Sequence, residues 1–207
     1  MTQAGRPTHR PALHSLPKPP QERGGVLVLL AHPALHRSRV NRRLTDSIRG
    51  LDGVTVHDLY EAYPDFDIDV RHEQALLAAH KTLVWQHPFY WYSTPALLKE
   101  WQDLVLEFGW AYGPEGNSLH GKIFLSALTT GGPEQAYQTE GFNRFTIQQL
   151  LAPIEQTARL CGMEPLPPFV IHGTHRFTEP DIERHADDYR RVILALRDGD
   201  VASLLGA

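Results

Sequence analysis

The sequence has a single cysteine and no long apolar run. Cys161 stands alone among 207 residues, which excludes an internal disulfide and is usual for a protein of the reducing cytosol. The longest apolar stretches, such as residues 26–31, are far shorter than the roughly 20 residues that a helix needs to cross a bilayer. Both absences predict a cytoplasmic protein.

Strong positive charge and several well-known catalytic motifs are also missing. The formal net charge is −4, and no predicted helix carries a basic stripe, so we expect no nucleic-acid partner. No G-x-G-x-x-G or G-x-x-x-x-G-K-[ST] motif is found, and these absences argue against a dinucleotide fingerprint and a Walker-type phosphate loop. The absence of G-x-S-x-G leaves a serine hydrolase without support.

The 12 histidines raise the question of a metal site. His32 and His36 are four residues apart, and His172 and His175 are three apart. Neither pair has a nearby set of carboxylates or cysteines that would complete a zinc site. Local spacing therefore predicts no metal.

Apolar residues make up 42% of the chain, which is enough for a sizeable core. The first 24 residues are proline-rich and lack apolar periodicity, so they are predicted to form a disordered tail. We expect one globular domain over residues 25–198 and a short C-terminal tail over residues 199–207.

Short apolar runs alternate with segments of helical period along this domain. Strands are predicted near residues 26–31, 54–59, 82–85, 123–128 and 169–171. Helices are predicted near residues 39–49, 73–80, 97–108, 147–161 and 182–196. Five strands, each followed by a helix, predict a three-layer α/β fold with a parallel sheet of order 2-1-3-4-5 and helices on both faces.

Ligands of such sheets bind beside the carboxyl ends of the strands, so the loops after strands one, three and four are informative. The first loop leads into a helix N-terminus, which suits a phosphate group. His32, Ser38, Arg39, Val40 and Asn41 are its candidate ligand contacts. The alternative is that Ser38 only caps the helix and His32 only ends the strand.

The loop after strand three holds four consecutive aromatic residues between two prolines. These are Phe89, Tyr90, Trp91 and Tyr92. A flat apolar ligand would bury such a cluster, whereas a strand would send alternate rings into water. The alternative is an aromatic cluster that caps the sheet or packs in a dimer interface.

The loop after strand four reads Thr129-Thr130-Gly131-Gly132. Paired glycines allow the backbone to approach a ligand closely, and their N–H groups could face the electron-rich pyrimidine edge of a flavin. A plain turn would also use Gly-Gly. The coincidence of three unusual loops at one predicted edge favours a binding site.

These residues also carry a family resemblance, which runs from about residue 26 to about residue 197. The chain resembles the flavodoxin-like NAD(P)H:quinone oxidoreductases, and within them the KefF-type ancillary oxidoreductases of the glutathione-regulated potassium-efflux system. The motifs that carry it are His32-Pro33, Tyr63-Pro64-Asp65-Phe66, Trp85-Gln86-His87-Pro88, Trp91-Tyr92, Pro95-Ala96-Leu97-Leu98-Lys99-Glu100-Trp101, Gly109-Trp110-Ala111-Tyr112-Gly113, Thr129-Thr130-Gly131-Gly132 and Leu166-Pro167-Pro168-Phe169.

The resemblance implies a flavodoxin-like, FMN-bound homodimer that reduces a quinone, with its active sites at the subunit interface. For such an enzyme we expect that NADH or NADPH first reduces the flavin and that the quinone then takes its place, which is a ping-pong mechanism. It implies FMN contacts at His32, at residues 38–41 and 89–92, and at residues 129–132. Tyr137 is the implied catalytic residue, but Asn143 stands where the family's relay histidine would fall, so the proton for the acceptor would come from Tyr137 or from water. The alternative function is a regulatory subunit at the cytoplasmic face of a potassium-efflux antiporter, with a mainly structural flavin.

Overall fold

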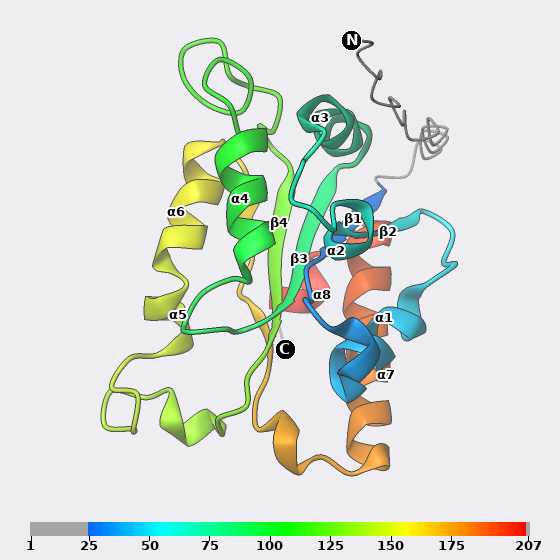
Figure 1. Cartoon of the computed structure of the whole chain (residues 1–207), viewed down its shortest axis with the longest axis vertical. Helices are drawn as coiled ribbons and strands as arrows, with labels where there is room; N and C mark the ends of the chain where they lie inside the picture. The colour runs from blue at the N-terminus through cyan, green and yellow to red at the C-terminus, as the bar shows by residue number, and fades with distance from the viewer. Residues whose placement is uncertain (1–24, 206–207) are drawn as a thin grey trace, which may run out of the picture.

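The centre of the fold is a fully parallel β-sheet, shown in Figure 1. This computed structural model describes residues 25–205, so the predicted tail over residues 1–24 lies outside the described part. The strands are β1 (Val26–Leu30), β2 (Val54–Asp58), β3 (Thr82–Pro88), β4 (Ile123–Thr129), β5 (Glu164–Pro165) and β6 (Phe169–Ile171).

The strand order is β2-β1-β3-β4-β5, which confirms the predicted order, and β6 is an additional strand that pairs with β4. The predicted fifth strand is β6, and β5 is a two-residue segment that pairs with the first half of β4. All five residues of β1 are fully buried, as expected for an apolar strand covered on both faces.

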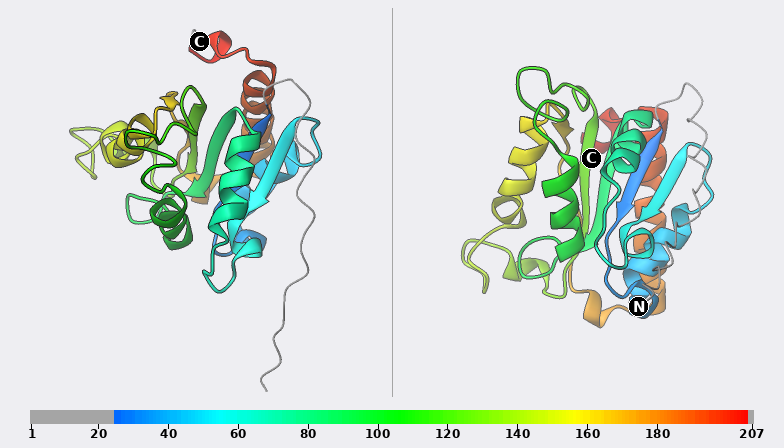
Figure 2. Two further views of the ribbon diagram at one scale, coloured as in Figure 1. Left: turned by 90° about the horizontal axis from the view of Figure 1, so that it is seen from above. Right: turned by 45° about the horizontal axis from the view of Figure 1, so that its top comes forward.

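Helices cover both faces of the sheet, as the two views of Figure 2 show. One face packs against α1 (Arg39–Ile48) and α7 (Glu179–Asp198), whose apolar residues share one core cluster. The other face packs against α2 (Leu59–Ala62), α3 (Val70–Ala79), α4 (Ala96–Val105), α5 (Ile147–Leu150) and α6 (Ala152–Leu160). The short helices η1 (Leu35–Arg37), η2 (Glu134–Ala136) and η3 (Thr174–Arg176) lie in connections, and α8 (Ala202–Leu205) follows α7.

Several boundaries differ from the sequence prediction for local physical reasons. β3 continues to Pro88, three residues beyond its predicted end, because residues 86–88 keep the parallel register with residues 127–129 of β4. The predicted helix over residues 147–161 is two helices, because Pro153, in the first turn of α6, lacks the amide hydrogen that a continuous helix would use. α3 begins at Val70, three residues earlier than predicted, where Asp69 caps its N-terminus. Residues 199–205 include α8, a helix within the predicted C-terminal tail.

Candidate functional site

The loops that follow β1, β3, β4 and β6 enclose a cleft of about 710 Å³ at the carboxyl edge of the sheet. A volume of this size suits a cofactor. The residues that line it are His32, Ala34, Arg37, Ser38, Arg39, Val40, Asn41, Pro88, Phe89, Tyr90, Thr129, Gly131, Thr174 and His175. The structure therefore brings together most of the residues that the three loops predicted.

The N-terminus of α1 forms one end of this cleft. Ser38 is the N-cap, and its Oγ accepts a hydrogen bond of 3.1 Å from the Asn41 amide. Helix geometry leaves the amides of Arg39 and Val40 without intrahelical acceptors, and the helix dipole adds partial positive charge there. The start of α1 therefore offers an anion both backbone donors and a favourable field.

The charged groups of this loop are arranged differently from the sequence expectation. Arg39 bonds Glu179 of α7 at 2.5 Å and the Phe177 carbonyl at 3.2 Å, so its guanidinium is engaged with the end of the β6–α7 connection. Burial lowers the pKa of His32, and its Nδ1 accepts a bond from the Ala34 amide at 3.1 Å. His32 is therefore neutral at pH 7 and can donate a hydrogen bond through Nε2. The positive charge of the cleft lining comes from Arg37 as well as from Arg39.

Asn41 connects the first loop to the third. Its buried side-chain amide donates to Thr129 Oγ1 at 2.9 Å, whereas its Oδ1 has no hydrogen-bond partner among the described residues. Because buried polar atoms are nearly always satisfied, this oxygen marks a place where a bound donor, such as a sugar hydroxyl, would fit.

The two glycines after β4, here called the glycine cradle, leave little room for a side chain. A Cβ on Gly131 would lie 2.5 Å from His175 Nε2, and one on Gly132 would lie 3.2 Å from the Tyr137 ring. Thr130 stabilises the turn, since its Oγ1 donates to the Gly132 carbonyl at 2.8 Å. Backbone here can therefore approach a ligand closely.

The aromatic residues after β3 divide into two groups. Phe89 and Tyr90 line the cleft, and Tyr90 packs edge-on to His32 with ring centroids 6.3 Å apart. Trp91 is 93% exposed and Tyr92 is 46% exposed, and neither lines the cleft. Both have a positive φ, 48° and 63°, which costs free energy for residues of this size.

The candidate catalytic residue Tyr137 lies beside the cleft, in a second cavity of about 610 Å³. Its ring centroid is 5.4 Å from that of His172 and 6.2 Å from that of Phe89. Burial raises the pKa of the Tyr137 phenol, although hydrogen bonds with Thr130 and Asn143 act in the opposite direction. The phenol is therefore protonated at neutral pH and can donate.

Sequence reasoning missed five of the lining residues, which are Ala34, Arg37, Pro88, Thr174 and His175. Thr174 and His175 follow β6, whose carboxyl end lies at the same edge as those of β1, β3 and β4. The rule that ligands bind at this edge applies to every strand end, so the sequence His172-Gly173-Thr174-His175 could have been included.

The lining fits a singly phosphorylated flat ring such as FMN. The amides at the start of α1 match a phosphate, the unsatisfied Asn41 Oδ1 matches a hydroxyl, and the glycine cradle beside Phe89 and Tyr90 matches a ring edge.

In the described part of the chain, no helix is both long and apolar enough to cross a membrane.

Comparison with known proteins identifies related chains. A family model described as having a flavodoxin-like fold matches residues 25–193. The glutathione-regulated potassium-efflux system ancillary protein KefG of Serratia proteamaculans is 50% identical over 164 residues, which cover 79% of this chain and 90% of that protein.

Two solved structures are similar in both sequence and shape. The general stress protein 14 of Treponema denticola, solved in complex with FMN, is 40% identical with a TM-score of 0.80 and covers 83% of this chain and 99% of its own. An NADPH-quinone reductase from P. pentosaceus is 31% identical with a TM-score of 0.75 and covers 82% of this chain and 97% of its own.

Proposed function

The chain belongs to the family with the flavodoxin-like fold, and on this premise we propose that it is an FMN-dependent NAD(P)H:quinone oxidoreductase. The observation that carries the proposal is the cleft of about 710 Å³, in which a helix N-terminus, an aromatic pair and a glycine cradle meet. The FMN complex of a 40% identical protein and the NADPH-quinone reductase at 31% identity support the cofactor and the substrates.

Each part of the cleft has a defined task in this proposal. Ser38 and the first amides of α1 would hold the phosphate, and Asn41 Oδ1 would accept a hydrogen bond from the ribityl chain. Phe89 and Tyr90 would pack against the ring, and the backbone of residues 129–132 would face its pyrimidine edge. When bound, FMN supplies the two-electron carrier between the nicotinamide and the quinone in a ping-pong sequence.

Tyr137 is proposed to provide the proton for the reduced acceptor. Its phenol is protonated at neutral pH, lies next to Gly132 and opens into the neighbouring cavity of about 610 Å³. A phenol in this position can donate a hydrogen bond to a quinone oxygen and lose its proton as negative charge develops there. In the proposed homodimer, a second copy would cover the exposed Trp91.

The purified protein is expected to be yellow and to release FMN rather than FAD on denaturation. Initial rates with NADPH or NADH and a simple quinone should give parallel double-reciprocal lines. Ser38→Ala should weaken FMN binding about 10- to 100-fold, since it removes a hydrogen bond to a charged group worth about 1.5–3 kcal/mol. Ser47→Ala, on the same helix but outside the cleft lining, should bind FMN normally. A colourless protein that gains no spectrum and no activity on addition of FMN would refute the proposal.

A second candidate function is regulation of a potassium-efflux antiporter, with flavin mainly structural. The 50% identity to a KefG protein favours it. Efflux measured with Tyr137→Phe, which should bind FMN but turn over slowly, separates the two functions. Regulation that survives the loss of turnover would favour the regulatory function, and regulation lost in parallel with turnover would favour catalysis.

A further inference from the structure

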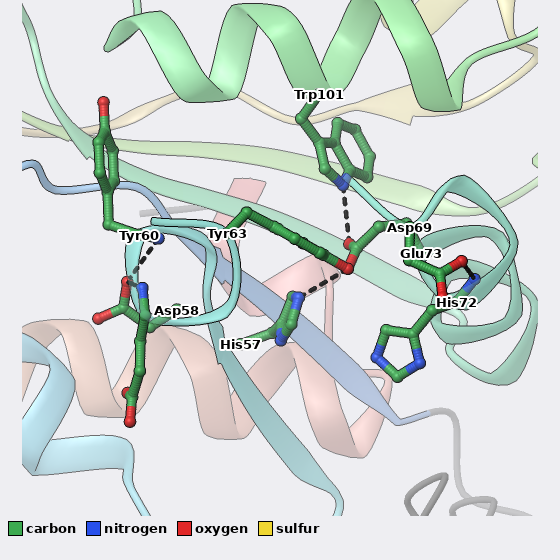
Figure 3. A network of polar contacts seen from close by, with 9 residues as sticks. His57, Asp58, Tyr60, Tyr63, Asp69, His72, Glu73 and Trp101 are labelled. Carbon is green, nitrogen blue, oxygen red and sulfur yellow. Dashed lines mark hydrogen bonds and ion pairs between the residues drawn. The ribbon is translucent and has the colours of Figure 1, made fainter. Parts of the chain in front are cut away.

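A cluster of two imidazoles and a carboxylate lies outside the cleft, between the edge strand β2 and helix α3. His57 comes from the end of β2, and His72 and Glu73 come from the first turn of α3. One ligand atom of each residue lies within 4.8 Å of the others. Among the described residues this is the only group of three such side chains close enough to hold a metal ion, and Figure 3 shows it.

The carboxylate of Glu73 is held in place before any ion could bind. Glu73 is fully buried, and Tyr63 Oη donates to its Oε1 at 2.6 Å while Trp101 Nε1 donates to its Oε2 at 2.7 Å. Asp69 caps α3 by accepting a bond from the His72 amide at 3.0 Å, which fixes the turn that carries both ligands. Hydrogen-bonded carboxylates of this kind are usual around protein metal sites.

His57 contacts this carboxylate directly, since its Nε2 donates to Glu73 Oε1 at 2.7 Å. A tetrahedral zinc ion with bonds of about 2.0–2.2 Å holds its nitrogen and oxygen ligands about 3.3 Å apart. The ion could therefore replace the proton between these two atoms if they separate by about 0.6 Å. The hydrogen bond between His57 Nε2 and Glu73 Oε1, and a metal ion that bridges the same two atoms, are therefore alternative states with nearly the same geometry.

His72 is placed to provide the third ligand of the site. Its ring centroid is 6.0 Å from that of His57, with the two planes tilted by 58°. The His72 side chain is partly exposed at the start of the helix, whereas Glu73 beside it is buried. A rotation of the His72 ring would bring its nitrogen to the ion, and a water molecule would occupy the fourth position.

We propose that His57, His72 and Glu73 form a site for a divalent transition metal of the zinc type, which would tie the edge strand β2 to α3. Two imidazole nitrogens with one carboxylate oxygen are a ligand set that zinc accepts. Sequence spacing does not reveal it, because His57 and His72 lie 15 positions apart and belong to different elements. The alternative is that the cluster is purely structural and the Glu73 carboxylate only accepts hydrogen bonds.

The test uses the untagged full chain, stripped with a chelator and titrated with Co²⁺, whose visible d–d bands report tetrahedral coordination. We expect one tetrahedral Co²⁺ per chain, displaced by Zn²⁺, and a rise in the unfolding temperature on addition of Zn²⁺. His72→Gln keeps the size of the side chain and should weaken Co²⁺ binding by about 100-fold or more, because a direct ligand matters at least as much as its supporting groups.

His120→Ala is the matched control, since His120 is an exposed histidine outside the cluster. It should bind Co²⁺ like the wild type. The proposal is overturned if the wild type shows no saturable tetrahedral spectrum, or if His72→Gln binds Co²⁺ as tightly as the wild type. Near-ultraviolet circular dichroism of His72→Gln verifies that the variant is folded before its spectrum is compared.

Discussion

Replacing Glu73 by glutamine should destabilise the protein more than any surface change of the same kind. Burial alone would raise the pKa of Glu73. The hydrogen bond and the charge of His57, together with the hydrogen bonds from Tyr63 and Trp101, outweigh burial, so the pKa of Glu73 is lowered overall. The carboxylate is therefore ionised at neutral pH. It accepts hydrogen bonds from His57, Tyr63 and Trp101, which Figure 3 draws around it. A glutamine has only one acceptor atom, and its NH₂ group would face at least one of these donors.

The magnitude follows from the contacts that are lost. A hydrogen bond to a charged group contributes about 1.5–3 kcal/mol, and breaking a buried charged network costs about 3–5 kcal/mol. Glutamine keeps the volume and one acceptor, so we expect the lower limit, about 3 kcal/mol. With a urea slope of about 2 kcal/mol per M, the unfolding midpoint should fall by about 1.5 M.

The assay is equilibrium urea unfolding in the presence of chelator, followed by tryptophan fluorescence and far-ultraviolet circular dichroism. Tyr63→Phe removes one donor and should cost about 1.5 kcal/mol. Glu155→Gln, which loses only an exposed pair with Arg159, should change stability by less than about 0.5 kcal/mol. A Glu73→Gln variant within 0.5 kcal/mol of the wild type would contradict the network described above.

Three further changes test other parts of the molecule. Gly131→Ala places a Cβ 2.5 Å from His175 Nε2 and should weaken FMN binding about ten-fold by fluorescence titration, and adding His175→Ala should restore it. Burial lowers the pKa of His87 from 6.5 to about 4, so between pH 6.5 and pH 4 the unfolded chain binds more protons than the folded chain. The free energy of unfolding should therefore fall as the pH drops through this window, by up to about 3 kcal/mol. His87→Gln should show a shallower fall in pH-dependent urea midpoints. Tyr189→Phe removes a buried bond of 3.0 Å to Gln86 and should cost about 1 kcal/mol by thermal or urea unfolding, and no loss would mean that Gln86 is satisfied elsewhere.

The sheet was predictable because its strands are buried on both faces. The run of residues 26–30 is apolar at every position, and the structure buries all five. Helix boundaries were less predictable where proline or a cap decides them. Pro153 breaks a continuous apolar stripe into α5 and α6, since periodicity reports the buried face and not the backbone hydrogen bonds.

The candidate site was predictable only from the rule that ligands of parallel sheets bind beside the carboxyl ends of the strands. That rule placed Ser38, Phe89 and Gly131 in one cleft. It could not show that Arg39 bonds Glu179, because that partner lies 140 residues away. The same limit applies to His57 and Glu73, which meet only through the packing of α3 beside β2.

Gln86 explains why the cleft can be formed before a ligand binds. From inside β3, its Nε2 donates to the Asn41 carbonyl at 3.2 Å and to Thr45 Oγ1 at 3.0 Å, while its Oε1 accepts from Tyr189 of α7. The Asn41 side chain in turn donates a buried hydrogen bond to Thr129 of β4. The start of α1 is thus tied to β3, β4 and α7 by buried hydrogen bonds that no ligand has to create. Because these loops are already ordered, ligand binding loses little free energy to ordering them. The contacts to the phosphate and to the ring therefore determine the affinity.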